Sequence, residues 1–396
     1  MTGAVVDAGA PASRSEQVLY GGLLVLALVG LASPGQYNVA PAGTLLEVTF
    51  FVAMALLAPR LASGAGAILL LASGYVGLKL LLLELYGSAS LPDFVLAYKA
   101  YIYLVALAFA VAKARFDGPR LARVTTVLVA AFLLKYGYSL AFGLDPRPGI
   151  YIENNFELIM LIGLVQLAWP YLGWRRGPVF VALAATVLAS GSRSAALGLL
   201  CVYVVLYLRT SVRTWPLHLA GVTVVGYAVL TVFSSRAAAD GSVELDRLVF
   251  FQTFLYEVRH WPIWEFLTGS FPLTPLSPGS CGSLSFYTPL FSRTDPGICY
   301  SVILHSFVLR GIFDHGVLGV VLLYVLVWRG LRSSGVTLRD TVGLLALITV
   351  SGFSVSTFNN VFVAIVLAVA MGLHRSRPRP TPDAVPALTR ELSSSG

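Results

Sequence analysis

Residues 178–208 read PVFVALAATVLASGSRSAALGLLCVYVVLYL, two apolar runs on either side of the polar turn SGSRSA. Apolar runs of this kind recur along the 396-residue chain, in which 57% of the residues are hydrophobic and only 12% are charged. Backbone groups in lipid must be hydrogen-bonded internally, which leaves helices or closed barrels as spanning structures. Because the alternating pattern of barrel strands is absent, the sequence predicts an all-α polytopic membrane protein.

About twelve transmembrane helices are predicted, each close to the length that crosses roughly 30 Å of hydrocarbon. A leader at 1–17 precedes them, one large polar loop at 234–304 interrupts them, and a proline-rich tail at 374–396 that we expect to be disordered follows them. The predicted spans are residues 18–33, 43–58, 66–83, 94–112, 124–142, 156–173, 178–190, 194–208, 215–233, 316–328, 341–356 and 360–373.

Every second connection between these spans is rich in lysine and arginine. Short basic loops remain in the cytoplasm, so both termini and the basic connections are predicted to be cytoplasmic. The net charge of +8 suits an anionic membrane leaflet and requires no nucleic acid. The basic residues in question are Arg60, Lys113, Arg115, Arg120, Arg123, Arg175, Arg176, Arg209, Arg213, Arg329, Arg332, Arg339, Arg375, Arg377 and Arg379.

This topology places the SGSRSA turn on the outer face, where Arg193 breaks the charge rule. A guanidinium near lipid is costly unless it is paired or faces a watery cavity, so Arg193 is a candidate functional residue. The structural alternative is a helix cap by Ser192 or Ser194, with Arg193 reaching the outer headgroups.

The 234–304 loop is also predicted to be outside. Within it, LDRLVFFQTFLYEV forms an amphipathic pattern that puts Arg247, Phe251, Phe254 and Val258 on one helical face, directed towards the membrane domain. Arg247 is therefore a second candidate, unless it pairs locally with Asp246 or Glu244.

Cysteine usage in the same loop indicates a disulfide. Cys281 and Cys299 share the outer loop, whereas Cys201 lies inside a predicted span. In an oxidising compartment the two loop cysteines are expected to pair with each other. No neighbouring His or Cys completes a zinc set, so a metal site is the weaker interpretation.

The loop is followed by HSFVLRGIFDHGVLG at 305–319, whose apolar positions predict a surface helix that then turns into the bilayer. His305 opens this helix, and Arg310 and His315 follow. Ten residues separate the two histidines, which places them about 80° apart on a helix and argues against one shared ligand site. A lone histidine is more often a hydrogen-bonded structural residue than a catalyst. His305 is nevertheless a candidate base, because outward arginines and a polar loop accompany it in a membrane domain with few other bases.

A further outer segment, DPRPGIYIENNFEL at 145–158, stands before a predicted span. Some of its polar residues are expected to cap that helix. They could also bind sugar hydroxyls, and the candidates are Arg147, Glu153, Asn154, Asn155 and Glu157. In the membrane interior, three lysines need a cavity or partners such as Glu47 or Glu84: Lys79, Lys99 and Lys135.

The order of these features resembles the O-antigen ligase and polysaccharide polymerase superfamily. The resemblance covers roughly residues 145–330 and rests on the SGSRSA turn, the long outer loop and the HSFVLRGIFDHGVLG helix. The ENNFE segment favours the polymerase branch. Relatives often carry His-Asn at the helix start, whereas this chain has His305-Ser306.

The resemblance implies a metal-independent membrane glycosyltransferase of the GT-C type in a bacterial inner membrane, with its active site facing the periplasm. The donor would be an oligosaccharide on undecaprenyl diphosphate and the acceptor another glycan. Arg193 and Arg247 would contact the diphosphate, His305 would be the general base, and Arg310 would assist in glycan binding. Direct displacement would invert the anomeric configuration. The alternative within the superfamily is a ligase that transfers glycan to lipid A core.

A polytopic transporter is the alternative from another functional class, since about twelve spans with both ends inside describe many carriers. Transporters often show internal repeats and binding sites at the bilayer midplane. The sequence shows no repeat, and its unusual polar groups cluster on one face.

Overall fold

The computed structural model describes residues 12–374, except 36–37, 60, 63, 88–89, 145–146, 153, 208–214, 217–218, 221, 224–225 and 227–245; the side chains of 154, 246, 247 and 289 are also outside the description. This described part is helical and contains no strand beyond an isolated bridge between Phe116 and Leu373. The predicted tail after His374 and most of the ninth predicted span lie outside it.

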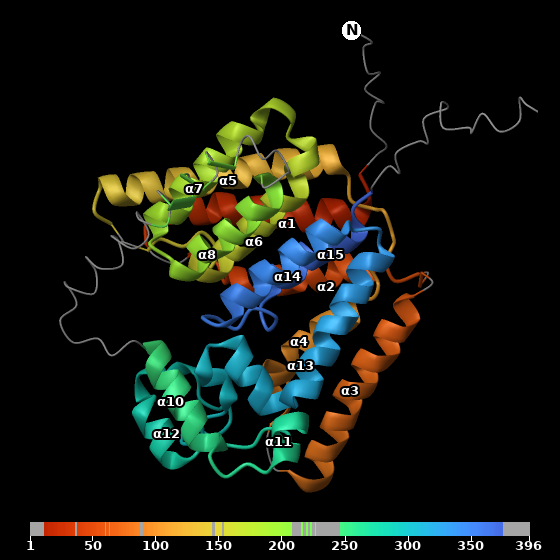
Figure 1. Ribbon diagram of the computed structural model, residues 1–396, viewed down its shortest axis with the longest axis vertical. Helices are drawn as coiled ribbons and strands as arrows, with labels where there is room; N and C mark the ends of the chain where they lie inside the picture. Colours follow the sequence, from red (N-terminus) through yellow and green to blue (C-terminus); the bar gives the residue numbers. More distant parts are fainter. Residues whose placement is uncertain are drawn as a thin grey trace, which may run out of the picture.

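The helices follow one another along the chain with short connections (Figure 1). Each predicted span except the ninth overlaps one of them, and α1 begins four residues inside the predicted leader. Their bounds are α1 Arg14–Ala32, α2 Ala42–Ala55, α3 Ala65–Tyr86, α4 Leu91–Leu107, α5 Gly118–Ala141, α6 Asn154–Ala168, η1 Trp169–Tyr171, η2 Gly173–Arg175, α7 Arg176–Ser190, α8 Arg193–Tyr207, α10 Asp246–Val258, α11 Ile263–Thr268, α12 Pro278–Ser283, η3 Ser285–Leu290, η4 Ser301–Leu304, α13 Phe307–Ser333, α14 Leu338–Gly352 and α15 Val361–Gly372.

Four of the described helices are long and apolar enough to cross a membrane: α1, α3, α5 and α13. Shorter apolar helices include α2, α8 and α15. The chain therefore has the character of a helical membrane protein, while the number of twelve spans stays a prediction.

Helix α15 is the centre of the main core, because all twelve of its residues are buried. A helix that is apolar on every side is stable only when other helices surround it. Close approach is possible where a neighbour carries glycine: a Cβ on Gly163 of α6 would stand 2.7 Å from Val366 of α15.

Hydrogen bonds between the connections that join the helices fall into two groups. Connections predicted to be cytoplasmic contact each other: Ser13 Oγ donates to the Arg115 carbonyl at 3.0 Å, and the Ala112 N–H donates to Ser334 Oγ at 2.9 Å. Connections predicted to be outside do the same, as where Asn38 Nδ2 donates to the Ile150 carbonyl at 2.9 Å. Helices that cross alternately would give this grouping.

Helix α13 contains a break at Gly316, which has φ 66° and ψ 175°. The first part, up to His315, packs on the insertion between α8 and α13, and the second part runs beside α3 in the lower half of Figure 1. Gly316 permits the break because a Cβ there would overlap the backbone of Leu267, at 2.3 Å from its carbonyl oxygen. The predicted change from surface helix to span at residue 316 coincides with this break.

The insertion between α8 and α13 has a small core of its own. Phe250, Phe254 and Val258 of α10 bury their side chains in it, together with the joined Cys281 and Cys299. The predicted cysteine pairing is thus present. The predicted face of α10 is wrong at Phe251, which is 46% exposed, because α10 packs on the insertion's own core through Phe250 instead.

Candidate functional site

The connection between α14 and α15, residues 353–360, holds the start of α13. Ser356 Oγ donates to the His305 carbonyl at 3.0 Å, and the Phe307 N–H donates to the Val355 carbonyl at 3.2 Å. Ser306 caps α13 by accepting from the Leu309 N–H and donates to the Gly352 carbonyl at 3.1 Å. Ser306 thus has a structural role at the start of α13.

The turn between α7 and α8 is built from glycine and serine. Gly191 ends α7 with φ 58°, a conformation that glycine adopts at little cost. Ser192 Oγ accepts from the Ala195 N–H at 3.3 Å, so the predicted capping of α8 is confirmed. Ser192 Oγ also donates to Asn155 Oδ1 at 2.8 Å, which joins this turn to the start of α6.

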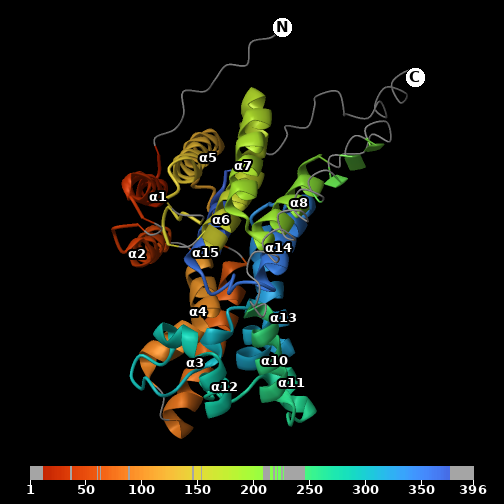
Figure 2. The same ribbon diagram turned by 90° about the vertical axis from the view of Figure 1, so that its left-hand side faces the viewer.

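Helices α8 and α14 pack side by side in opposite directions (Figure 2). A Cβ on Gly198 would meet Leu347 and Ser351, whereas one on Gly343 would meet Val205. Arg193 lies five residues, about 7.5 Å of helix, before Gly198, and Ser351 lies one residue before the end of α14 at Gly352. The Arg193 turn and the 353–360 connection, which holds His305, therefore lie at the same end of the helix pair.

His305 has an uncommon backbone, with φ 45° and ψ −29°. A non-glycine residue in this region costs on the order of 1–3 kcal/mol, and such residues cluster at functional sites. Its half-buried ring lies against Phe250 and Tyr287, with centroid distances of 5.7 Å and 4.7 Å. Two aromatic residues of the outer insertion thus fix the orientation of the candidate base.

Arg193 is the first residue of α8 and is half-buried. A cation at a helix N-terminus adds to the positive end of the helix dipole, which is unfavourable by about 0.3–1 kcal/mol. An anion at this turn would interact with both the guanidinium and the positive end of the helix dipole. The arrangement suits a phosphate-bearing ligand.

The structure places the other predicted site residues in different surroundings. Arg147 is exposed, and Asn155 bonds Ser192 as described above. Glu153 and the side chains of Asn154 and Arg247 lie outside the described residues.

Glu157 and Arg310 were predicted to bind glycan, but both are buried and have structural roles. Glu157 is fully buried and accepts the N–H groups of Ile150, Tyr151 and Ile152 at 2.5–2.9 Å, which closes the turn before α6. Arg310 is 3% exposed, lies 3.5 Å from the Asp314 carboxylate and donates to the Leu96 carbonyl of α4. Several of these partners are close in sequence, but the Leu96 carbonyl is 214 residues from Arg310, so local sequence could not show that contact.

The interior lysines have three different surroundings. Lys99 pairs with Glu47, one of the two predicted partners. Lys135 is buried and donates to the carbonyl oxygens of Gly30, Ser33 and Gly35. Lys79 lines a cavity between α3, α11 and α13.

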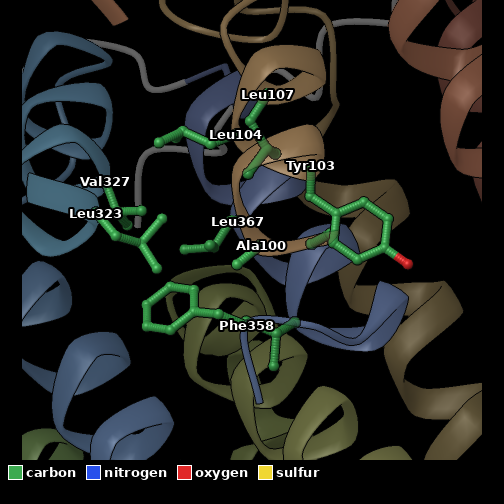
Figure 3. A pocket seen from close by; sticks show the side chains of 10 residues that line it. Ala100, Tyr103, Leu104, Leu107, Leu323, Val327, Phe358 and Leu367 are labelled. Carbon is green, nitrogen blue, oxygen red and sulfur yellow. The ribbon is translucent and has the colours of Figure 1, made fainter. Parts of the chain in front are cut away.

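A second gap, between α4, α13 and α15, is apolar and holds only about 10 Å³ (Figure 3). Phe358 of the 353–360 connection faces Leu323 and Leu367 across it. This volume is about that of one water probe, and the lining offers no polar partners, so the gap is a packing feature that anchors the connection.

Sequence reasoning missed Asp93, which ties the outer insertion to α4. Asp93 stands just before the predicted span at 94–112 and is 3% exposed. Its carboxylate accepts from Ser292 Oγ at 2.6 Å, Ser90 Oγ at 2.7 Å and the Arg293 N–H at 3.0 Å. Burial alone would raise the pKa of Asp93, but these hydrogen bonds and the nearby Arg293 side chain together lower it.

Asp93→Ala should loosen the insertion around Ser292. Three donors would lose their acceptor, which costs about 1–3 kcal/mol, so the Arg293 amide should exchange about 5- to 150-fold faster. Hydrogen exchange of the purified protein measures this. The pKa of Asp93 in the folded protein lies below its unfolded value of about 3.9. The ionised carboxylate therefore stabilises the fold fully above about pH 3.9, and this stabilisation is lost as the pH falls through the folded pKa.

The matched control is Asp295→Asn, an exposed carboxylate in the same loop. It should leave the Arg293 amide nearly unchanged, and equal exchange in both variants would refute the role assigned to Asp93.

Comparison with protein-family models, with curated proteins and with solved structures returned no match. Among the described residues, no group of three or more His, Cys, Asp or Glu side chains is placed to hold a metal ion.

Proposed function

We propose that this protein is a membrane glycosyltransferase of the polysaccharide polymerase type. It transfers glycan from a polyprenyl diphosphate carrier, of the undecaprenyl class, to a hydroxyl of an acceptor glycan at the outer face of a bacterial inner membrane. The observation that carries the proposal is that the Arg193 turn and the connection holding His305 lie at the same end of α8 and α14.

In the proposed reaction the acceptor oxygen attacks the anomeric carbon of the donor, and the bond from that carbon to the diphosphate oxygen breaks. His305 takes the proton of the acceptor hydroxyl, and the lipid diphosphate leaves. Negative charge grows on the leaving diphosphate, so a fixed guanidinium stabilises the transition state more than the ground state. Arginine suits this task because its planar fork matches phosphate oxygens.

The helix start also supports an anionic leaving group, because the positive end of the α8 dipole lies beside Arg193. Phe250 and Tyr287 confine the His305 ring on the side of the insertion. A general base must be held near the proton that it removes, and this confinement serves that need.

The decisive test is incubation of the purified protein with lipid-linked oligosaccharide, with and without lipid A core. Long glycan formed without core supports the polymerase. Transfer that requires core would instead identify the ligase alternative, and the absence of transfer in both reactions would contradict the glycosyltransferase proposal.

A further inference from the structure

A second, larger cavity than the gap beside Phe358 is separate from the site above. It has a volume of about 520 Å³ and lies between α3, α11 and α13. That volume is in the usual range for small-molecule sites, about 300–1,000 Å³. In Figure 1 these three helices meet at the lower end of the molecule, where α11 closes the space between the two longer ones. Both longer helices, α3 and α13, are candidate membrane spans.

One wall of the cavity is apolar and accessible from the lipid side. Leu78, Leu82, Leu318 and Leu322 line it, and Leu78 and Leu318 are more than half exposed. Further exposed leucines and valines continue along the same two helices: Leu70, Leu71, Leu81 and Leu85 on α3, with Val317, Val321 and Val325 on α13. A hydrocarbon chain could follow this surface directly from the bilayer.

The aromatic residues around the opening are those found at headgroup level. Trp264 of α11 lines the cavity and is 63% exposed, and Tyr86 at the end of α3 packs its ring edge-on against Phe271. Tryptophan and tyrosine favour the boundary between hydrocarbon and water. The polar part of a bound lipid would therefore lie beside them.

Two opposite charges line the cavity without bonding each other. Lys79 Nζ lies 3.4 Å from the carbonyl oxygens of Ser270 and Asp314, and no described carboxylate stands within 4.0 Å of it. Glu265 of α11 is half-buried in the cavity lining. The Asp314 carboxylate accepts a hydrogen bond from Ser301 Oγ and forms an ion pair with Arg310. The Tyr75 hydroxyl is hydrogen-bonded to His315 Nδ1.

From this arrangement we infer that the cavity is a binding site for a zwitterionic phospholipid with a primary amine, such as phosphatidylethanolamine. The Lys79 ammonium would bind the phosphate, the Glu265 carboxylate would accept from the headgroup amine, and the acyl chains would lie along the leucine wall. A primary ammonium can donate to a carboxylate, whereas the quaternary ammonium of phosphatidylcholine cannot. An anionic lipid would place like charge beside Glu265.

The test is native mass spectrometry of the delipidated full-length protein titrated with single lipids. Phosphatidylethanolamine should bind at least about fivefold more tightly than phosphatidylcholine, phosphatidylglycerol or a polyprenyl phosphate of the same concentration. Equal affinity for all four, or preference for either anionic lipid, would overturn the inference.

Two single variants assign the charges, and each has a matched control. Lys79→Gln should weaken the binding of all phospholipids, because it removes the contact with the phosphate. Glu265→Gln should lower the affinity for phosphatidylethanolamine to that for phosphatidylcholine. The affinity for phosphatidylcholine should stay unchanged. The controls are Lys113→Gln, in a predicted cytoplasmic connection, and Glu84→Gln, an exposed carboxylate of α3 outside the cavity lining.

A second measurement separates misfolding from lost binding. Size-exclusion profiles and thermal unfolding should match the wild type for Glu265→Gln, whose carboxylate has no hydrogen bond among the described residues. An unchanged lipid preference in a folded Glu265→Gln variant would refute the amine contact. Glycan transfer need not be active for this experiment, so its outcome is independent of the proposed function.

Discussion

His305→Ala and His305→Gln are expected to lower glycan transfer by roughly 10²- to 10⁴-fold while the protein still folds and inserts. A sugar hydroxyl is a poor nucleophile near neutral pH, and proton removal during attack is worth about that factor. Histidine is the side chain best suited to this step near neutral pH. The ring lies against Phe250 and Tyr287 of the insertion core, and its residue is not part of the main helical core, which should therefore stay intact.

The measurement is the initial rate of polymer formation by the purified protein across a range of pH. In the wild type the rate should fall on the acid side, where the base becomes protonated, and this fall should disappear with the His305 side chain. His260→Gln is the matched control, because His260 is an exposed histidine of the same insertion. Its rate and pH profile should remain those of the wild type.

The competing base is a carboxylate of the ENNFE segment. Near-normal rates in both His305 variants, with loss confined to Glu153→Gln, would transfer the role to Glu153. Glu157→Gln is expected to act differently, since Glu157 accepts three backbone N–H groups and its loss should lower the folding yield together with the rate. A retained anomeric configuration in the product would indicate a covalent intermediate on a carboxylate in place of direct displacement.

Arg193→Ala is expected to lower glycan transfer by ~30- to 1000-fold. Loss of a charge-assisted contact that strengthens as the diphosphate leaves should cost on the order of 2–4 kcal/mol of transition-state stabilisation. Folding should not suffer, because alanine is a good helix former and removes a cation from the unfavourable end of the α8 dipole. The assay is the same rate of polymer formation, with thermal unfolding measured alongside.

Arg193→Lys should restore only part of the activity, because an ammonium carries the charge without the planar fork. Arg259→Ala is the matched control: Arg259 is an exposed arginine of the outer insertion, and its guanidinium stacks on the Tyr256 ring 3.7 Å from the centroid. Wild-type rates in Arg193→Ala would exclude a diphosphate contact at the α7–α8 turn.

Several features could be predicted because they depend on nearby residues. Apolar runs gave the helices, and their boundaries differ from the prediction by a few residues. The capping of α8 by Ser192 follows from a serine at a helix start, and the break in α13 falls at a glycine, Gly316. The pairing of Cys281 with Cys299 follows from a choice among only three cysteines.

The sequence by itself thus determined the helical membrane character and the main helices. The prediction that His305 opens the helix was wrong, because α13 begins at Phe307 after its N-cap Ser306 and His305 has a left-handed backbone. Only the tertiary structure decided that Phe250 rather than Phe251 is buried, that Glu157 closes a turn, and that Asp93 anchors the insertion. It also decided that the Arg193 turn and His305 share one end of the α8 and α14 pair. The physical reason is that hydrophobic periodicity is a local property, whereas the partner of a polar side chain is set by segments distant along the chain, such as Ser292 for Asp93, 199 residues away.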